Sequence, residues 1–362
     1  MGDSANLPAV ITQLLSLPRE AGTPGADAAR SIVTAHLTTL GYEVRLQRFT
    51  FAPASLNAFP VFGAGLGGLA LAALPVLSSQ RLPDWSGLAV WVAGLVALGL
   101  LAAGIGLGWA ALDQGLREDA NIVATRPGSS PRRWVVAHLD SKAQGHSMAG
   151  RLVAVWSVIA AVGVFTLLTL LRLRGAVGLG WLAGGAGLAL LAGLLASRGR
   201  LRGTSPGARD NASGVVAALA AAEECRDSNT GILITGAEEF GLVGARIFAR
   251  LTPNLQEFEF LNLDTLDQEG KLYVVSHDAR GEELGHQLER RLAGLGLPVQ
   301  HRRLLWGIFV DSAPLARAHA ASVTLGRLTW ATLRRIHTSA DTADDLSYRT
   351  AEQVGRAIVA SN

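Results

Sequence analysis

Four long apolar segments set the strongest limit on how this chain can fold. They span residues 58–77, 87–112, 152–171 and 175–196, and none of them contains a charged residue. A helix of about 20 apolar residues is long enough to cross the hydrocarbon core of a bilayer. One such segment could be a buried core helix, but four in a chain of 362 residues are not typical of a soluble domain. With 49% hydrophobic and only 17% charged residues, the chain is predicted to contain four transmembrane helices.

The connections between these segments predict two transmembrane hairpins, at residues 58–112 and 152–196. Residues 78–86 separate the first two segments, and residues 172–174 separate the last two. A hairpin returns the chain to the side it left, so we expect all remaining blocks on one side of the bilayer. Small residues four positions apart allow close helix packing, and they occur in both hairpins: Gly63 with Gly67, and Gly180 with Gly184.

Basic residues are more frequent beside the polar blocks than at the hairpin tips. The tips hold Arg81, Arg172 and Arg174. The flanks on the polar side hold a larger set: Arg45, Arg48, Arg117, Lys142, Arg151, Arg198, Arg200 and Arg202. Because such residues favour the cytoplasmic side, we expect an integral membrane protein with four spans and a cytoplasmic polar domain. The expected partner of these basic flanks is the lipid bilayer, not nucleic acid; the oligomeric state stays open.

The blocks outside the hairpins, residues 1–53, 117–150 and 202–362, predict one discontinuous α/β domain. Strand-like apolar runs alternate with helix-like runs along these blocks. Strands are expected at 42–46, 121–124, 134–138, 231–235, 257–264, 271–275 and 322–325, and helices at 28–40, 212–224, 242–251, 282–295, 313–320 and 351–360. This alternation predicts a mostly parallel, mixed central sheet flanked by helices, with the two hairpins as insertions.

Six residues that can bind metal or move protons lie at the ends of these expected elements. They are His138, Asp210, Glu238, Glu239, Asp264 and His337. Ligands of open α/β sheets bind at the carboxyl ends of the strands, so these side chains can converge at one edge. Adjacent carboxylates such as Glu238 and Glu239 repel each other, but a metal ion beside a general base would use both.

The residue types indicate metal-assisted hydrolysis. Two imidazoles and three carboxylates can hold two divalent ions if one carboxylate bridges them, and zinc suits this mixture of nitrogen and oxygen ligands. The sixth group would then be a free carboxylate. Such a carboxylate can take a proton from water and later give it to a leaving amine, which is the chemistry of amide hydrolysis.

Five short motifs occur in an order that resembles one known family. They are AHLDS at 137–141, GARDNASG at 207–214, GAEEFGLVGA at 236–245, NLD at 262–264 and RIHTSADT at 335–342. The opening segment LPREAGTPGADAARSIVTAHLTTLGYEV also resembles that family. The chain is similar to the co-catalytic zinc aminopeptidases, a family that also includes glutamate carboxypeptidases and glutaminyl cyclases. Each motif alone is weak, but together they cover all three polar blocks in order.

The resemblance assigns a role to each matching residue and implies a zinc aminopeptidase-like fold with two Zn²⁺ ions per chain. His138 and Asp264 would bind one ion, Glu239 and His337 the other, and Asp210 would bridge both. Glu238 would be the general base. Asp140 would orient the His138 imidazole, and Asp341 would do the same for His337. Asn211 would shape the loop that carries Asp210.

Two departures separate this chain from soluble relatives. The hairpins interrupt the domain, once between the strands at 42–46 and 121–124 and once between the first two motifs. Loops tolerate such insertions when their ends stay close together. Some relatives place a tyrosine at the oxyanion, but Tyr42, Tyr273 and Tyr348 offer no clear match. We expect substrate contacts at residues 305–312.

These expectations leave more than one function open. The first is a membrane-bound aminopeptidase that hydrolyses N-terminal residues of peptides. The second is a glutaminyl cyclase or carboxypeptidase on the same scaffold, and cyclases of this family commonly use one zinc. The third is a membrane scaffold without catalytic activity, although such proteins usually lose metal ligands and none is lost here.

Overall fold

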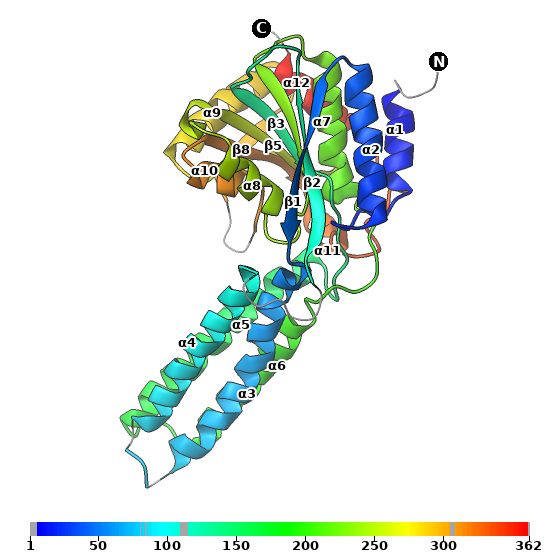
Figure 1. Cartoon of the computed structure of the whole chain (residues 1–362). Coiled ribbons are helices and arrows are strands. Elements are labelled where there is room, and N and C mark those ends of the chain that lie inside the picture. The colour runs from blue at the N-terminus through cyan, green and yellow to red at the C-terminus, as the bar shows by residue number, and fades with distance from the viewer. Residues whose placement is uncertain (1–5, 80, 84, 109–114, 305–307, 361–362) are drawn as a thin grey trace. The chain divides into compact units, whose positions relative to one another are not determined.

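The computed structural model of the chain describes residues 6–79, 81–83, 85–108, 115–304 and 308–360. The chain forms two compact units, each built from separate segments (Figure 1). The first comprises Met1–Phe51, Arg117–Ala143 and Gly203–Asn362 and is called the polar unit. The second comprises Ala52–Leu116 and Gln144–Arg202 and is called the helical unit.

The polar unit contains a mixed sheet of eight strands. They are β1 (Glu43–Phe51), β2 (Arg117–Thr125), β3 (Arg133–His138), β4 (Thr230–Thr235), β5 (Glu259–Leu266), β6 (Lys271–Ser276), β7 (Val299–Arg303) and β8 (Ala321–Leu328). Their spatial order is β1-β2-β4-β3-β5-β8-β6-β7. The central neighbours β4, β3, β5 and β8 are parallel, whereas the β1–β2, β2–β4 and β6–β8 pairs are antiparallel. The predicted fold class is therefore confirmed.

Strand β7 was not among the predicted strands. Its sequence, Val-Gln-His-Arg-Arg, holds one apolar residue and lacks the apolar alternation of a half-buried strand. It lies at the edge of the sheet and pairs only with β6 among the described strands. Charged side chains are typical of edge strands, where they oppose pairing with a second sheet.

Helices cover both faces of this sheet. One face carries α1 (Leu7–Leu15), α2 (Pro24–Thr39), α7 (Ser213–Glu224), α9 (Ala279–Gly294) and α12 (Arg349–Val359), which form the larger apolar core with the strands. The other face carries α8 (Val243–Leu251) and α10 (Ser312–Arg317), which cover a smaller core around Trp134, Phe248 and Phe260. A short helix, α11 (Trp330–Arg335), follows β8.

Helix α7 explains why this region of the sequence is so rich in alanine. Residues 213–222 of the helix are all buried, because it lies between the sheet and α12. A methyl group added at Gly355 of α12 would lie 2.0 Å from the backbone oxygen of Ala217. Small side chains on both helices therefore permit their close approach and fix α7, whose amino end follows the loop of Asp210.

The register of the central strands brings the predicted site residues to one edge. His138, the last residue of β3, is paired in parallel with Thr235, the last residue of β4. On the other side, Val136 of β3 is level with Asn262 of β5. Two residues further along, His138 and Asp264 are therefore neighbours across the strand pair. Glu238 and Glu239 follow β4 within one short turn.

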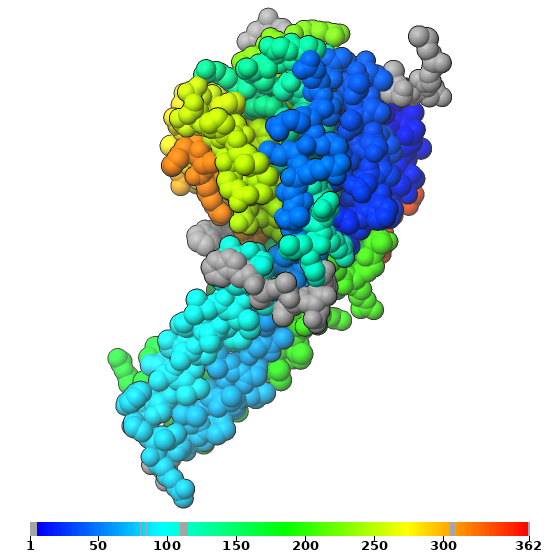
Figure 2. Space-filling view, in the orientation of Figure 1, coloured from blue at the N-terminus to red at the C-terminus, as the bar shows by residue number. Residues whose placement is uncertain are grey.

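The helical unit contains the four apolar helices. They are α3 (Ala58–Ser78), preceded by the 3₁₀ turn Pro53–Asn57, then α4 (Ser86–Gly106), α5 (Met148–Leu173) and α6 (Leu179–Ser197). All four are long and apolar enough to cross a membrane by length and composition. Helices α3 and α4 cover the face of this unit that is visible in Figure 2. Residues 109–112 of the expected first hairpin lie outside the described residues.

The two hairpins pack on each other mainly through α3 and α6. A methyl group added at Gly193 would lie 2.2 Å from the backbone oxygen of Gly63, and one at Gly67 would lie 2.7 Å from the Cα of Leu190. The prediction of close packing at Gly63 and Gly67 is therefore confirmed. It is wrong for Gly180 and Gly184, where an added methyl group meets no atom within 4 Å.

Candidate metal centre

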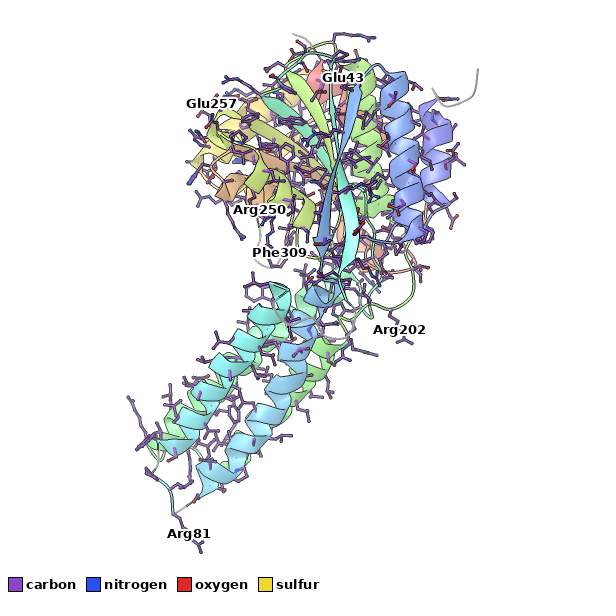
Figure 3. All side chains as sticks on the ribbon, viewed as in Figure 1. Glu43, Arg81, Arg202, Arg250, Glu257 and Phe309 are labelled. Carbon is purple, nitrogen blue, oxygen red and sulfur yellow. The ribbon has the colours of Figure 1, made fainter. Side chains whose placement is uncertain are left out.

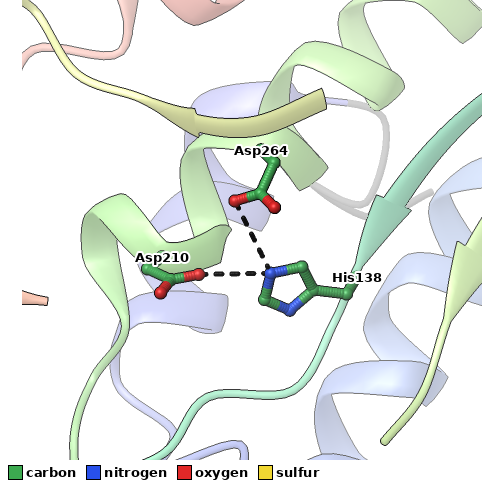
Figure 4. A group of neighbouring side chains, drawn as sticks. All are labelled: His138, Asp210 and Asp264. Carbon is green, nitrogen blue, oxygen red and sulfur yellow. Dashed lines mark ion pairs between the residues drawn. The ribbon is translucent and has the colours of Figure 1, made fainter. Parts of the chain in front are cut away.

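The carboxylate of Asp210 lies between two histidines. Its Oδ1 is 3.2 Å from Nε2 of His138, and its Oδ2 is 3.0 Å from Nε2 of His337. Oδ1 of Asp264 lies 3.9 Å from the same nitrogen of His138, as Figure 4 shows. Oε1 of Glu239 lies 3.5 Å from the ring nitrogen of His337. The structure thus brings all five predicted metal ligands together.

These residues form two clusters with one member in common. The first is His138, Asp210 and Asp264, and the second is Asp210, Glu239 and His337. The ligand atoms within each cluster lie within 4.8 Å of one another. Zinc binds nitrogen and oxygen at about 2.0–2.2 Å, so the ligand atoms of one ion lie about 3–4 Å apart. The donor set and its spacing therefore fit zinc, and Asp210 belongs to both clusters.

The orphaned oxygen of Glu239 also fits a metal ligand. Its Oε1 is buried and has no hydrogen-bond partner among the described residues. A buried carboxylate oxygen without a partner is costly unless a cation or a donor satisfies it. An ion held by Glu239, Asp210 and His337 would satisfy this oxygen.

Asp341 holds the backbone of the Asp210 loop. Its two carboxylate oxygens accept the backbone N–H groups of Arg209 and Asp210 at 2.9 and 3.1 Å. The expectation that Asp341 orients His337 is therefore wrong, since Nδ1 of His337 has no hydrogen-bond partner among the described residues. Burial opposes the charged form of Asp210, but hydrogen bonds from His138 and His337 outweigh it and lower the pKa of Asp210.

Asn211 connects the Asp210 loop to the end of β5, as expected of a residue that shapes this loop. Its side-chain nitrogen donates to the carbonyl of Leu263 at 2.9 Å. Its side-chain oxygen accepts the N–H groups of Gly214 and Thr265 at 3.0 and 3.1 Å. These bonds fix the distance between Asp210 and Asp264, which belong to segments more than 50 residues apart in the sequence.

Asp140 positions the two glutamates more directly than it positions the histidine. Its carboxylate oxygens accept the backbone N–H groups of Glu238 and Glu239 at 3.0 and 3.1 Å. His138 is oriented by the backbone carbonyl of Asp140, which lies 3.0 Å from Nδ1, whereas the nearer carboxylate oxygen is 3.8 Å away. Burial raises the pKa of Asp140 to about 6, against the favourable charge of His138.

Glu238 is buried and surrounded mostly by other acids. Burial raises the pKa of Glu238 well above its usual value; His138 opposes this shift, whereas Glu239, Asp311 and Asp264 add to it. A carboxylate with a raised pKa suits a general base, because it binds a proton more readily. The turn before it is strained, since Ala237 has a φ of 51°. His337, with a φ of 67°, also adopts the left-handed conformation, which is uncommon outside functional or tightly constrained positions.

Three buried residues of this region were missed or only indirectly indicated by the sequence. The ammonium of Lys142 binds Oε2 of Glu239, and both side chains are buried. The sequence places Lys142 among the basic flanks of the helices, because no motif shows which carboxylate it meets. The carboxylate of Asp311 accepts a hydrogen bond from Thr235, and burial raises the pKa of Asp311 to about 7. Asp311 lies within the predicted substrate region 305–312, of which residues 305–307 are outside the described part.

Arg19 is the third of these residues and is fully buried. Its guanidinium donates to four backbone carbonyls. Two of these bonds, to Leu139 at 2.9 Å and Gly207 at 2.9 Å, join the His138 strand end to the Asp210 loop. The others reach Leu14 at 3.2 Å and Pro206 at 2.6 Å. The opening motif contains this arginine, but the sequence does not show that three of its four partners, Leu139, Pro206 and Gly207, lie more than 100 residues away.

Comparisons with known proteins agree with this fold. The sequence profile described as Peptidase family M28 matches residues 197–361, which include four of the five predicted metal ligands. The profile match supports a hydrolase and, with the donor set, implies zinc. No curated protein sequence matches the chain.

Solved structures share the fold of the whole chain at low sequence identity. An aminopeptidase from Aneurinibacillus sp. strain AM-1 is 15% identical, with 98% of this chain and 93% of that chain covered and a TM-score of 0.58. A zinc aminopeptidase from Bacillus subtilis is 15% identical, with coverages of 98% and 94% and a TM-score of 0.58. A glutaminyl cyclase from Bacteroides thetaiotaomicron is 14% identical, with coverages of 99% and 96% and a TM-score of 0.58. The fold is thus that of the zinc aminopeptidases.

Proposed function

We propose that the chain is a zinc-dependent aminopeptidase of the M28 type that removes N-terminal residues from peptides. The observation that carries this proposal is the position of Asp210, whose two oxygens face one histidine each at 3.2 and 3.0 Å. A carboxylate in this position can bridge two ions. Glu238 then remains as a buried carboxylate that belongs to neither ligand cluster.

The protein groups would divide the work as follows. His138 and Asp264 would hold one zinc ion, Glu239 and His337 the other, and Asp210 both. Zinc in such a centre supplies a Lewis acid that polarises the peptide carbonyl and makes water more acidic. Glu238 would take the proton from water and deliver it to the leaving amine. Asp140 would keep Glu238 in place, because its carboxylate accepts the backbone N–H of Glu238 at 3.0 Å.

Replacement of Glu238 by glutamine tests this assignment. Removal of a general base lowers turnover by about 10²–10⁴-fold, and we expect E238Q to lose activity to this extent on a panel of aminoacyl amides. Its zinc content should equal that of the wild type, because Glu238 belongs to neither cluster. The control is E269Q, at an exposed position on the surface. Normal hydrolysis by E238Q would refute the mechanism.

One observation favours a glutaminyl cyclase as the second candidate. The ammonium of Lys142 on Glu239 adds positive charge beside the second cluster, which disfavours a second divalent ion. A centre with one ion would suit the cyclase alternative. Metal analysis combined with a peptide that begins with glutamine separates the two: two ions and release of the first residue support the aminopeptidase, whereas one ion and loss of ammonia support the cyclase.

We further propose that the helical unit spans a lipid bilayer four times and that the polar unit is cytoplasmic. Support comes from the length and composition of the four helices and from the excess of basic residues flanking the polar blocks. Single cysteines at Ser79 and Ser129 can report sidedness, because both positions lie in loops and native Cys225 is buried. In sealed vesicles of known orientation, a membrane-impermeant maleimide should label Ser129→Cys only from the cytoplasmic face. It should label Ser79→Cys only from the opposite face. Labelling of both from one face would refute the hairpin topology.

A further inference from the structure

The polar unit has a hollow at the end of the sheet opposite to the metal centre. It has a volume of about 580 Å³ and lies against helix α9, the start of β3 and the end of α12. Arg133, the first residue of β3, lines it, whereas His138, the last residue of that strand, belongs to the metal centre. Five steps along a strand correspond to about 17 Å. The hollow is therefore a separate site.

Three arginines line this hollow: Arg133, Arg290 and Arg291. Arg133 is neutralised in part by Glu259, whose carboxylate lies 2.9 Å from Nε and 2.8 Å from a terminal nitrogen. In the same region, Glu257, labelled in Figure 3, pairs with Arg132. Glu257 and Glu259 thus pair with Arg132 and Arg133.

Arg291 has incomplete partners. One terminal nitrogen donates to the backbone carbonyl of Ala360. Its Nε is buried and has no hydrogen-bond partner among the described residues. Burial and the positive charge of Arg133 both lower the pKa of Arg291. Two like charges near each other, with a donor left unsatisfied, form an arrangement that a bound anion would stabilise.

The remaining walls of the hollow are mostly apolar. Leu284, Leu288 and Leu295 contribute from α9 and the residue after it, and Leu261 contributes from β5. Small-molecule sites commonly have volumes of about 300–1,000 Å³ and apolar walls with a few polar groups that fix the ligand. Guanidinium groups bind carboxylate and phosphate in a bidentate manner, which gives such a site its selectivity for anions.

We propose that this hollow binds a small organic anion, with a carboxylate or phosphate group on Arg290 and Arg291 and an apolar group against the leucines. The site is independent of the zinc chemistry. Its place at the amino ends of β3 and β5 leaves the carboxyl ends of the strands, which carry the metal ligands, free for substrate.

Calorimetric titration of the full chain in detergent tests this proposal. The probes are benzoate and phenyl phosphate, with benzyl alcohol as the neutral probe of similar shape. We expect both anions to bind and the alcohol to bind at least about tenfold more weakly, because it lacks the charge-assisted hydrogen bonds. Comparison of benzoate with phenyl phosphate then shows which anionic group the site prefers.

Two arginine variants and one control locate the binding. R290Q changes an exposed side chain and leaves folding intact, and it should weaken anion binding several-fold. R291Q should weaken binding by about tenfold or more, while R291K keeps part of it. R226Q, an exposed arginine of the same unit outside the hollow, should bind as the wild type does. Equal binding by wild type, R290Q and R291Q would place the anion elsewhere, for instance on zinc, and would overturn the proposal, as would absence of binding to the wild type.

Discussion

The polar unit and the helical unit are stabilised by different kinds of contact. In the polar unit, buried ionisable groups such as Arg19, Asp140 and Asp341 each bind two or more backbone groups. Among the described residues of the helical unit, the buried polar side chains are those of Gln144 and Thr169. Its contacts instead involve glycines, alanines and large apolar residues.

The surfaces of the two units also differ in how many large apolar side chains they expose. Most of the large apolar side chains that are exposed belong to the helical unit, and Leu100 and Trp181 are exposed by 69% and 70%. Hydrogen bonds depend on direction, so the polar unit requires particular residues at particular places. Apolar packing depends on volume, so the helical unit requires small residues only where helices touch. Loss of a buried hydrogen-bonding group should therefore destabilise mainly the polar unit, whereas an increase in side-chain volume at a helix contact should destabilise the helical unit.

The largest effect is expected at Asp210, where the polar unit concentrates two functions in one side chain. Asp210 is the only residue that belongs to both ligand clusters among the described residues. D210A should therefore lose both zinc ions and lower hydrolysis by at least about 10³-fold, since loss of the ions removes both Lewis acids. Zinc content and turnover are the measurements, with E269Q as the control. A variant that retained both ions would show that Asp210 does not bridge.

Much of the polar unit was predictable because its signals are local. Strand ends at His138 and Thr235 follow from short apolar runs, and the six candidate metal-binding and proton-transferring residues follow from motifs of three to ten residues. Register then brings them together without further information from the sequence. The predicted transmembrane helices follow from composition alone, which is also a local property.

The features that could not be predicted from the sequence depend on contacts between distant segments. Nothing in the sequence states that Lys142 meets Glu239, or that Arg19 reaches the carbonyls of Leu139 and Gly207. In the helical unit, Gly180 and Gly184 have the same spacing as Gly63 and Gly67, yet only the latter pair lies at a helix contact. Spacing shows which face of a helix carries small residues, whereas tertiary packing decides which element, if any, lies against that face.

Arg19 should give the second largest effect, because it is buried and donates to four carbonyls. In R19L these carbonyls lose their donor, and each unsatisfied buried group costs about 1–3 kcal/mol. We expect the free energy of unfolding to fall by about 4 kcal/mol or more, measured by denaturant unfolding in detergent. R48L, at an exposed position on β1, is the matched control. Equal stability of the two variants would contradict the role of directional bonds in this unit.

Gly193 tests the volume requirement of the helical unit and should give a smaller effect. In G193V the added carbon would lie 2.2 Å from the backbone oxygen of Gly63, so α3 and α6 must separate. Overpacking of this kind costs about 1–3 kcal/mol, which thermal unfolding in detergent can detect. G184V lies on the same helix and introduces the same side chain into open space. Equal destabilisation would mean that helix propensity, and not the α3–α6 contact, causes the loss.

Lys142 should give the smallest effect, and its sign distinguishes two roles within the polar unit. Methionine in K142M keeps the length of the side chain but removes its charge. If the ammonium mainly opposes the second ion, zinc should bind the Glu239 cluster about tenfold more tightly, equivalent to about 1.4 kcal/mol. Titration of zinc into metal-free protein resolves this, with the His138 cluster as internal reference and K142R as the variant that keeps the charge. Weaker zinc binding by K142M would instead show that the ion pair positions Glu239. Removal of charge from the exposed arginines of the helical unit should leave zinc affinity unchanged, because that unit relies on packing volume.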